Sequence, residues 1–217
     1  MVDPLLTRSL AQAGSGRHIV VFDLETTGLI KPGLPIPRAW QLAAVKLKFD
    51  PSTTEITELL ASTAILNVGT PLPEIVAQIC QVDANLPLLR GWDPVVILAR
   101  FSKFLDGAVL AGQNILNFDV PILAEEYRRV GLPIPVQLTD PGWCIDTTLM
   151  ARTLFRGGGN VPSENGRPSN KLNVLGRWYG CDFDETKLHD AMNDVRLTAQ
   201  VLAALLGDVS KSLATAA

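Results

Sequence analysis

The pattern of hydrophobic positions divides the chain into a strand-rich first part and a helix-rich second part. A continuous apolar run at 19–22 predicts a buried strand that ends at the turn 26–28. Two further apolar segments, 40–49 and 55–66, predict strands, and the turn signal at 50–52 separates them. We expect these three strands to form an antiparallel meander.

Helical spacing dominates after residue 93. Asp93 and Pro94 predict an N-cap followed by a first-turn proline, and the helix they start is expected to end at Gly107. A short apolar strand at 108–112 follows. Further helices are predicted at 118–130, 147–155 and 172–179, and around the apolar stripe of 195–205. Strands followed by alternating strand and helix predict an α/β fold, a mixed sheet with helices packed on it.

The length of 217 residues predicts a single domain. We place this domain at 17–207, between a weakly structured lead-in at 1–16 and a short tail at 208–217. A stretch at 157–170 is rich in Gly, Pro, Ser and Asn, which predicts a flexible surface loop. An alternative is a mobile flap that helps to hold the phosphates of a substrate.

Composition excludes several classes of protein. Hydrophobic residues make up 47% and charged residues 19%, which is typical of a globular protein. No window approaches the roughly 18–20 apolar residues of a membrane span, and the first 17 residues lack the apolar region of a secretory signal. We therefore expect a cytoplasmic protein with no membrane partner. The three cysteines are far apart and form no CxxC pair, so neither a zinc knuckle nor a disulfide framework is indicated.

The net charge of −3 argues against a groove that grips nucleic acid through basic side chains alone. If the protein handles nucleic acid, bound metal ions are the obvious source of positive charge at the site.

The first candidate for chemistry is the pair Asp23 and Glu25. Side chains alternate along a strand, so the two carboxylates point to the same face at the end of a buried strand. Two acids side by side in a poorly solvated place repel each other, and a hard divalent cation such as Mg²⁺ or Mn²⁺ relieves that repulsion. Acids that flank a surface turn are common, so the pair alone is a weak signal.

The second candidate is Asp119. A strand is expected to leave Gly112 and a helix to begin near Asn117, a good N-cap residue, which places Asp119 in the first helical turn. An acid there commonly complements the helix dipole. The same placement suits a carboxylate that points to the open end of the sheet.

The third candidate joins His189 and Asp194. Five residues of helix leave side chains about 140° apart, so the two cannot share one helical face. If Asp190 is the N-cap, His189 lies on the preceding loop and Asp194 on the first turns of the helix. An isolated histidine before a helix is usually only a surface residue. The position of His189, five residues before an inward-facing Asp, favours a functional role.

Taken in order, the motifs resemble the DEDDh family of 3′→5′ exonucleases. They are Asp-x-Glu-Thr-Thr-Gly at 23–28, Asn-x-x-x-Phe-Asp at 114–119 and His-x-x-x-x-Asp at 189–194. The family includes the proofreading epsilon subunit of bacterial DNA polymerase III, ribonuclease T and oligoribonuclease. The resemblance extends over about residues 17–206 and implies a ribonuclease-H-like fold, with three antiparallel strands followed by parallel ones.

The resemblance also implies a role for each matching residue. The ligands of two Mg²⁺ or Mn²⁺ ions would be Asp23, Glu25, Asp119 and Asp194, with His189 as the general base. Contacts to the terminal nucleotide would come from Thr26, Thr27, Gly28, Leu29, Asn114 and Phe118. Asp146 matches an acidic position that supports the site without binding metal. The implied reaction is two-metal hydrolysis of a nucleic-acid 3′ end to nucleoside monophosphates.

Single-stranded DNA is the favoured substrate, and the resemblance suggests a DNA polymerase as a partner. Two alternatives stay open. The motifs do not separate a DNA exonuclease from an RNA-trimming or oligoribonuclease-type enzyme, because 2′-OH contacts lie outside them. A non-catalytic nucleic-acid-binding domain is disfavoured because all five site positions are present. Gln113 stands where many relatives have His, which changes no metal ligand, and the 157–170 loop is longer than in compact relatives.

Overall fold

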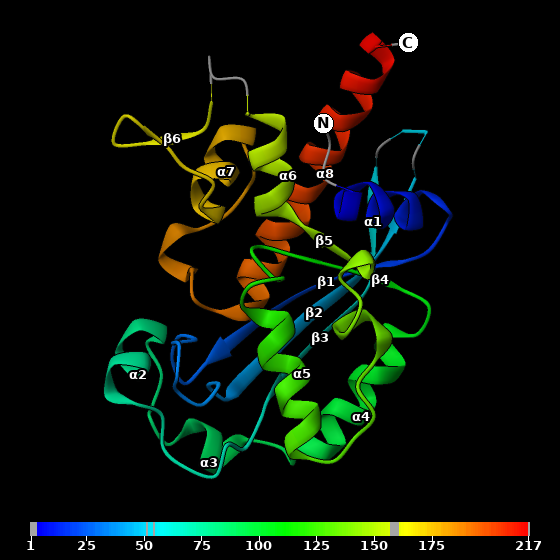
Figure 1. Cartoon of the computed structure of the whole chain (residues 1–217). Coiled ribbons are helices and arrows are strands. Elements are labelled where there is room, and N and C mark those ends of the chain that lie inside the picture. The colour runs from blue at the N-terminus through cyan, green and yellow to red at the C-terminus, as the bar shows by residue number, and fades with distance from the viewer. Residues whose placement is uncertain (1–3, 51, 54, 157–160, 217) are drawn as a thin grey trace.

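A five-stranded mixed sheet in the order β3-β2-β1-β4-β5 forms the centre of the molecule (Figure 1). The computed structural model describes residues 4–50, 52–53, 55–156 and 161–216. The strands of this sheet are β1 (Ile19–Thr26), β2 (Ala39–Phe49), β3 (Ile56–Ile65), β4 (Val109–Gly112) and β5 (Cys144–Asp146). β1, β2 and β3 pair antiparallel, whereas β4 pairs parallel with both β1 and β5. The predicted mixed sheet, antiparallel strands first and parallel strands after, is confirmed.

Helices cover both faces of the sheet (Figure 1). The α-helices are α1 (Pro4–Gly14), α2 (Glu74–Cys80), α3 (Leu86–Arg90), α4 (Pro94–Leu105), α5 (Asp119–Arg129), α6 (Thr147–Leu154), α7 (Leu172–Tyr179) and α8 (Ala191–Ala216). The 3₁₀ turns in the described residues are η1 (Val136–Leu138), η2 (Pro141–Trp143) and η3 (Glu185–Lys187). In the part of the chain that the structure describes, no helix combines the length and the apolar character that a bilayer crossing needs.

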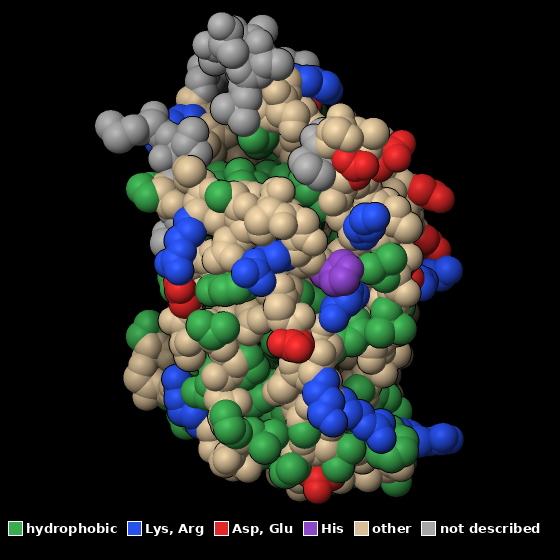
Figure 2. Space-filling model, turned by 90° about the vertical axis from the view of Figure 1, so that its right-hand side faces the viewer, with side chains coloured by type: hydrophobic (Ala, Val, Ile, Leu, Met, Phe, Trp, Pro, Cys, Tyr) green, Lys and Arg blue, Asp and Glu red, His purple; other side chains and the backbone are tan. Residues whose placement is uncertain are grey.

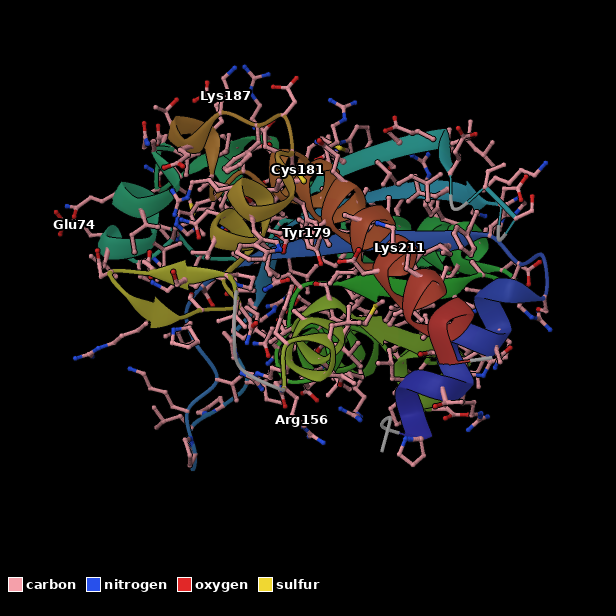
Figure 3. All side chains as sticks on the ribbon, turned by 90° about the horizontal axis from the view of Figure 1, so that it is seen from above. Glu74, Arg156, Tyr179, Cys181, Lys187 and Lys211 are labelled. Atoms are coloured by element: carbon pink, nitrogen blue, oxygen red, sulfur yellow. The ribbon has the colours of Figure 1, made fainter. Side chains whose placement is uncertain are left out.

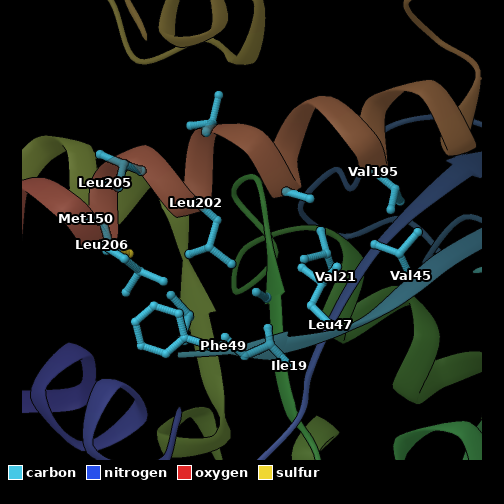
Figure 4. Close-up of a cluster of buried hydrophobic side chains, with 14 of the residues drawn as sticks. Ile19, Val21, Val45, Leu47, Phe49, Met150, Val195, Leu202, Leu205 and Leu206 are labelled. Atoms are coloured by element: carbon cyan, nitrogen blue, oxygen red, sulfur yellow. The ribbon is translucent and has the colours of Figure 1, made fainter. Parts of the chain in front are cut away.

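Alternation along β1 divides the core into two layers. Ile19 and Val21 belong to the cluster beneath α8, which Figure 4 shows, whereas Val20 and Phe22 pack with α4 and α5. All four side chains are fully buried, which explains why this strand is a continuous apolar run. The odd-numbered side chains of β1 thus point to the α8 face, and Asp23 is the next odd position after Val21.

A third, smaller cluster fixes α2 beside the sheet. Trp40, at the start of β2, is buried against Val76 and Ala77 of α2. This short helix was not among the helices predicted from the sequence, because seven residues give only a weak periodic signal. The packing of α2 on Trp40 places the helix next to the end of β1.

Several predictions about the periphery are wrong. The lead-in at 1–16 contains a helix, α1, whose Leu6 and Ala13 are buried and whose Arg8 pairs with Asp140 at 2.7 Å. The tail at 208–217 continues α8 as far as Ala216. In both segments, helix packing or continuation of a long helix outweighs a weak local signal.

The stretch at 157–170 contains a small hairpin. Its strands are β6 (Ser163–Glu164) and β7 (Arg167–Pro168), and residues 157–160 lie outside the described part of the chain. Asn165 and Gly166 form the turn with φ of 51° and 72°, the left-handed pair of a type I′ hairpin. The Asn-Gly dipeptide was the signal that could have predicted it.

Basic side chains do not gather into one stripe on the face seen in Figure 2, where Lys and Arg lie among apolar and acidic side chains. This distribution agrees with the small negative net charge of the chain.

Candidate active site

The ends of β1 and β4 and the starts of α5 and α8 meet at one cavity of about 540 Å³. The five residues predicted to carry the chemistry all line it: Asp23, Glu25, Asp119, His189 and Asp194. The fold therefore brings the three sequence motifs together, as predicted.

Motif two places Asp119 at the first residue of α5. Asp119 is 3% exposed, and its Oδ1 accepts a hydrogen bond from the N–H of Leu24 at 3.1 Å. This hydrogen bond holds the Asp119 carboxylate beside β1, at the residue that separates Asp23 from Glu25. Asn117 is not the N-cap that the sequence predicted: the cap position is Phe118, without a side-chain hydrogen bond. Asn117 donates from Nδ2 to Oδ1 of Asn114 instead, within the turn before the helix.

Asp146 stabilises that turn through a hydrogen bond. Its Oδ1 caps α6 through the N–H groups of Thr148 and Leu149, and its Oδ2 accepts the N–H of Leu116 at 3.2 Å. Asp146 does not line the cavity, and its role as a supporting residue stays a prediction.

Motif three depends on the start of α8. Asp190 caps the helix, because its Oδ1 accepts the N–H of Asn193 at 3.1 Å. His189 precedes the cap with a φ of 68°, and its N–H donates to Oδ2 of Asp194 at 3.1 Å. The predicted arrangement, with His189 on a loop and Asp194 on the first helical turn, is observed.

Glu25, His189 and Asp194 each offer a ligand atom within 4.8 Å of the others. Oδ1 of Asp194 is buried, and no described residue donates a hydrogen bond to it. A buried carboxylate oxygen without a partner is costly unless a cation or water satisfies it. The donors are mainly carboxylate oxygens, so they fit a hard divalent cation such as Mg²⁺ or Mn²⁺.

The electrostatics of the cavity favour positive charge. Burial raises the pKa of Glu25 and of Asp119 to about 8 and that of Asp194 to about 6. Burial, and then the charges of Asp119, Asp194 and Glu25, raise the pKa of Asp23 well above its ordinary value. With pKa values of about 8, Glu25 and Asp119 are largely protonated at neutral pH when no cation is bound, and a bound divalent ion would displace those protons.

The residues expected to contact the terminal nucleotide are not all at the cavity. Those that line it are Thr26, Gly28, Leu29, Asn114 and Phe118. Thr27 does not, because its Oγ1 accepts the N–H of Arg38 at 2.9 Å and so faces the start of β2. A role for the Thr27 side chain in contacting substrate is therefore not supported, although its backbone remains in the turn.

One wall of the cavity was not predicted from the sequence. It comes from α2 and consists of Ile75, Val76, Ile79 and Cys80. Ile75 and Ile79 are 62% and 50% exposed, unusual for isoleucine, and lie one helical turn apart. Apolar residues at 75, 76 and 79 were a signal of an amphipathic helix, but nothing local indicated that its exposed side would face the acids.

Gln113 connects the cavity to the hairpin segment. Its Nε2 donates to the backbone oxygen of Asn170 at 2.6 Å, and its Oε1 accepts from the hydroxyl of Thr147. The residue that departs from the His of many relatives thus joins three segments at the edge of the cavity.

Comparison with known proteins agrees with this geometry. Residues 84–202, more than half of the 217-residue chain, match the RNase T exonuclease family. The chain belongs to this exonuclease family. The matched segment contains Asp119, His189 and Asp194 but begins after Asp23 and Glu25.

Curated relatives are similar to this chain over more of its length than the family model. PolC-type DNA polymerase III of Lacticaseibacillus paracasei is 29% identical over 94% of this chain, and that of Mycoplasma pneumoniae is 27% identical over 84%. The chain spans only 12% and 11% of these proteins, about an eighth of their length or less.

Solved exonuclease structures share the fold. Exonuclease I of E. coli in complex with a dT13 oligonucleotide aligns with a TM-score of 0.70 at 20% identity, covering 92% of this chain and 42% of that one. Exonuclease I of Methylocaldum szegediense aligns with a TM-score of 0.67 at 21% identity, over 88% and 40%. The ribonuclease-H-like exonuclease fold expected from the motifs is therefore confirmed.

Proposed function

We propose that this exonuclease-family chain hydrolyses nucleic acid from the 3′ end and releases nucleoside 5′-monophosphates. Two Mg²⁺ or Mn²⁺ ions would be held by four carboxylates, those of Asp23, Glu25, Asp119 and Asp194. The observation that carries the proposal is the meeting of these acids with His189 in one cavity. The raised pKa values support it, because perturbed acids in a cleft are typical of functional sites.

His189 is proposed as the general base. It is exposed on its loop, and one of its ring nitrogens lies within 4.8 Å of oxygens of Glu25 and Asp194. It accepts a proton from the water whose oxygen attacks phosphorus, and the bond from phosphorus to the 3′-oxygen breaks with its electron pair on that oxygen. The ions, when bound, supply a more acidic water and stabilise the charge on the leaving oxygen.

Apolar side chains support an unpaired strand end as the substrate. Leu29, Ile75 and Ile79 line the cavity with half or more of their surfaces exposed, and Phe118 adds an aromatic ring. Such side chains can contact the faces of unstacked bases without reading sequence, whereas a duplex end would keep its bases stacked.

The names of the relatives favour DNA over RNA. The curated relatives are DNA polymerases, and the solved Exonuclease I holds a dT13 strand. A DNA polymerase as partner and the cytoplasm as the place of action stay predictions, as does a phosphate-holding role for the 157–170 segment.

Parallel digestion of a DNA strand and an RNA strand of one sequence tests the proposal. With the 5′ end labelled and Mn²⁺ present, we expect a ladder that shortens from the 3′ end, nucleoside 5′-monophosphate as product, and faster loss of DNA. Chelation of the metal should stop the reaction. Cleavage from the 5′ end, or within the strand, contradicts the proposal.

Equal or faster digestion of RNA would favour the exoribonuclease alternative. No digestion of either strand, with Mn²⁺ bound, would favour a non-catalytic binding domain.

A further inference from the structure

Cys80 lies against one of the proposed metal ligands. It is the last residue of α2, and its Sγ–H donates a hydrogen bond to Oε2 of Glu25 at 3.4 Å. Both residues line the cavity, and the thiol is half-buried. The contact joins residues 55 positions apart, so the tertiary fold and not local sequence creates it.

Packing and a helix cap hold Cys80 in position at the C-terminal end of α2. Val76 and Ala77 anchor the helix in the cluster around Trp40. The next residue, Gln81, adopts a left-handed conformation with a φ of 54°. The N–H of Val82 then donates a hydrogen bond to the backbone oxygen of Ala77 at 3.0 Å. This C-terminal cap fixes the direction in which the Cys80 side chain leaves the helix.

A hydrogen bond on a carboxylate matters when that carboxylate binds metal. A ligand that coordinates through one oxygen can still rotate, and a donor on the other oxygen limits that rotation. Among the described residues, the Cys80 thiol is the side-chain donor that the structure shows on Glu25. A thiol is a weak donor, but in a poorly solvated cavity water competes with it less than at the surface.

We propose that Cys80 is a positioning residue whose thiol holds the Glu25 carboxylate in the orientation that binds a divalent ion. This inference rests on the proposed function, because it requires Glu25 to be a metal ligand. Cys80 itself neither binds the ion nor touches the reacting atoms.

The test compares the unsubstituted 217-residue chain with its Cys80→Ala and Cys80→Ser variants. Calorimetric titration with Mn²⁺ gives the Kd, and kcat and KM are measured on a dT oligonucleotide at saturating Mn²⁺. Loss of a hydrogen-bond partner of a metal ligand typically weakens metal affinity by about 10–100-fold, and we expect this range for Cys80→Ala. Cys80→Ser keeps a donor, so its Kd should return to within a few fold of wild type. KM for DNA should be unchanged in both variants.

Cys181→Ala is the matched control. Cys181 is also a half-buried free cysteine, but it follows α7 and does not line the cavity. Figure 3 shows it well away from Glu74 of α2. Its substitution should leave the Mn²⁺ affinity at the wild-type value.

Two results overturn the inference while the proposed function stands. One is a wild-type Kd for Mn²⁺ in Cys80→Ala, and the other is equal weakening in the alanine and serine variants, which indicates a packing role. Failure of the proposed function looks different, because the wild-type chain would then bind no Mn²⁺ and leave DNA intact, and the inference would fall with it.

Discussion

Replacing Asp23 with asparagine is expected to reduce exonuclease activity at least about a thousandfold while making the metal-free protein more stable. The activity falls because the substitution removes a charged oxygen from the proposed metal site. Metal ions contribute several kcal/mol to such reactions, and about 4 kcal/mol corresponds to a thousandfold change in rate. Single-turnover digestion of labelled single-stranded DNA with Mn²⁺ measures the effect.

The gain in stability has a separate cause. Burial and the neighbouring charges of Asp119 and Asp194 raise the pKa of Asp23, so its charged form destabilises the metal-free fold. The raised pKa of Asp23 does not lower the stability of the fold below about pH 4, the pKa of an aspartate in the unfolded chain. Above that pH, the loss of stability grows until the pH reaches the pKa of Asp23 in the folded state. The stability advantage of Asp23→Asn should therefore be larger at pH 8 than at pH 5. We expect a higher Tm for the metal-free Asp23→Asn variant than for the wild type, with the larger difference at pH 8.

Lower activity together with higher stability distinguishes the loss of a metal ligand from simple misfolding, which would lower both activity and stability. Asp106→Asn is the control, because Asp106 is exposed at the end of α4 and does not line the cavity. It should leave activity and Tm unchanged. An Asp23→Asn protein that digests DNA at the wild-type rate contradicts the assignment of this residue.

Replacing His189 with asparagine should slow hydrolysis about 10²–10⁴-fold, the usual contribution of a general base. Asparagine is the appropriate substitute because His189 has a φ of 68°, a conformation that asparagine adopts more readily than most residues. The backbone hydrogen bond to Asp194 can then persist, and the variant loses the imidazole without added strain.

The dependence of the rate on pH distinguishes a base from a structural residue. Without His189 the reaction should accelerate as the pH rises, because hydroxide from solvent replaces the missing base. The affinity for Mn²⁺ should stay within a few fold of wild type, since the four carboxylates remain. A variant within threefold of the wild-type rate at neutral pH would show that His189 is not the base.

Much of this site follows from local rules of structure. The alternation of β1 predicted that Asp23 and Glu25 share a face, and the helix cap at Asp190 predicted the separation of His189 from Asp194. Both depend on the backbone geometry of one element, so a single sequence is sufficient. A mixed sheet that begins with an antiparallel meander was also predicted, from the order of strand and helix patterns, whereas the parallel strands after it were implied by the family resemblance.

What escaped prediction depends on packing between distant segments. The position of α2, and with it the contact of Cys80 with Glu25, is set by the burial of Val76 and Ala77 against Trp40. Asn117 has the chemistry of an N-cap, yet its amide bonds to Asn114 because the turn before α5 closes on itself. In these places tertiary contacts decide between conformations that the local sequence leaves nearly equal.

Binding of Mn²⁺ with release of protons tests the central claim, that acids from three distant segments form one cation site. At pH 7 Glu25 and Asp119, each with a pKa of about 8, are largely protonated. Calorimetry in two buffers of different ionisation enthalpy should show at least about one proton released per chain. With a nucleoside monophosphate present, about two ions per chain are expected. Absence of Mn²⁺ binding, or binding without proton release, would contradict the account.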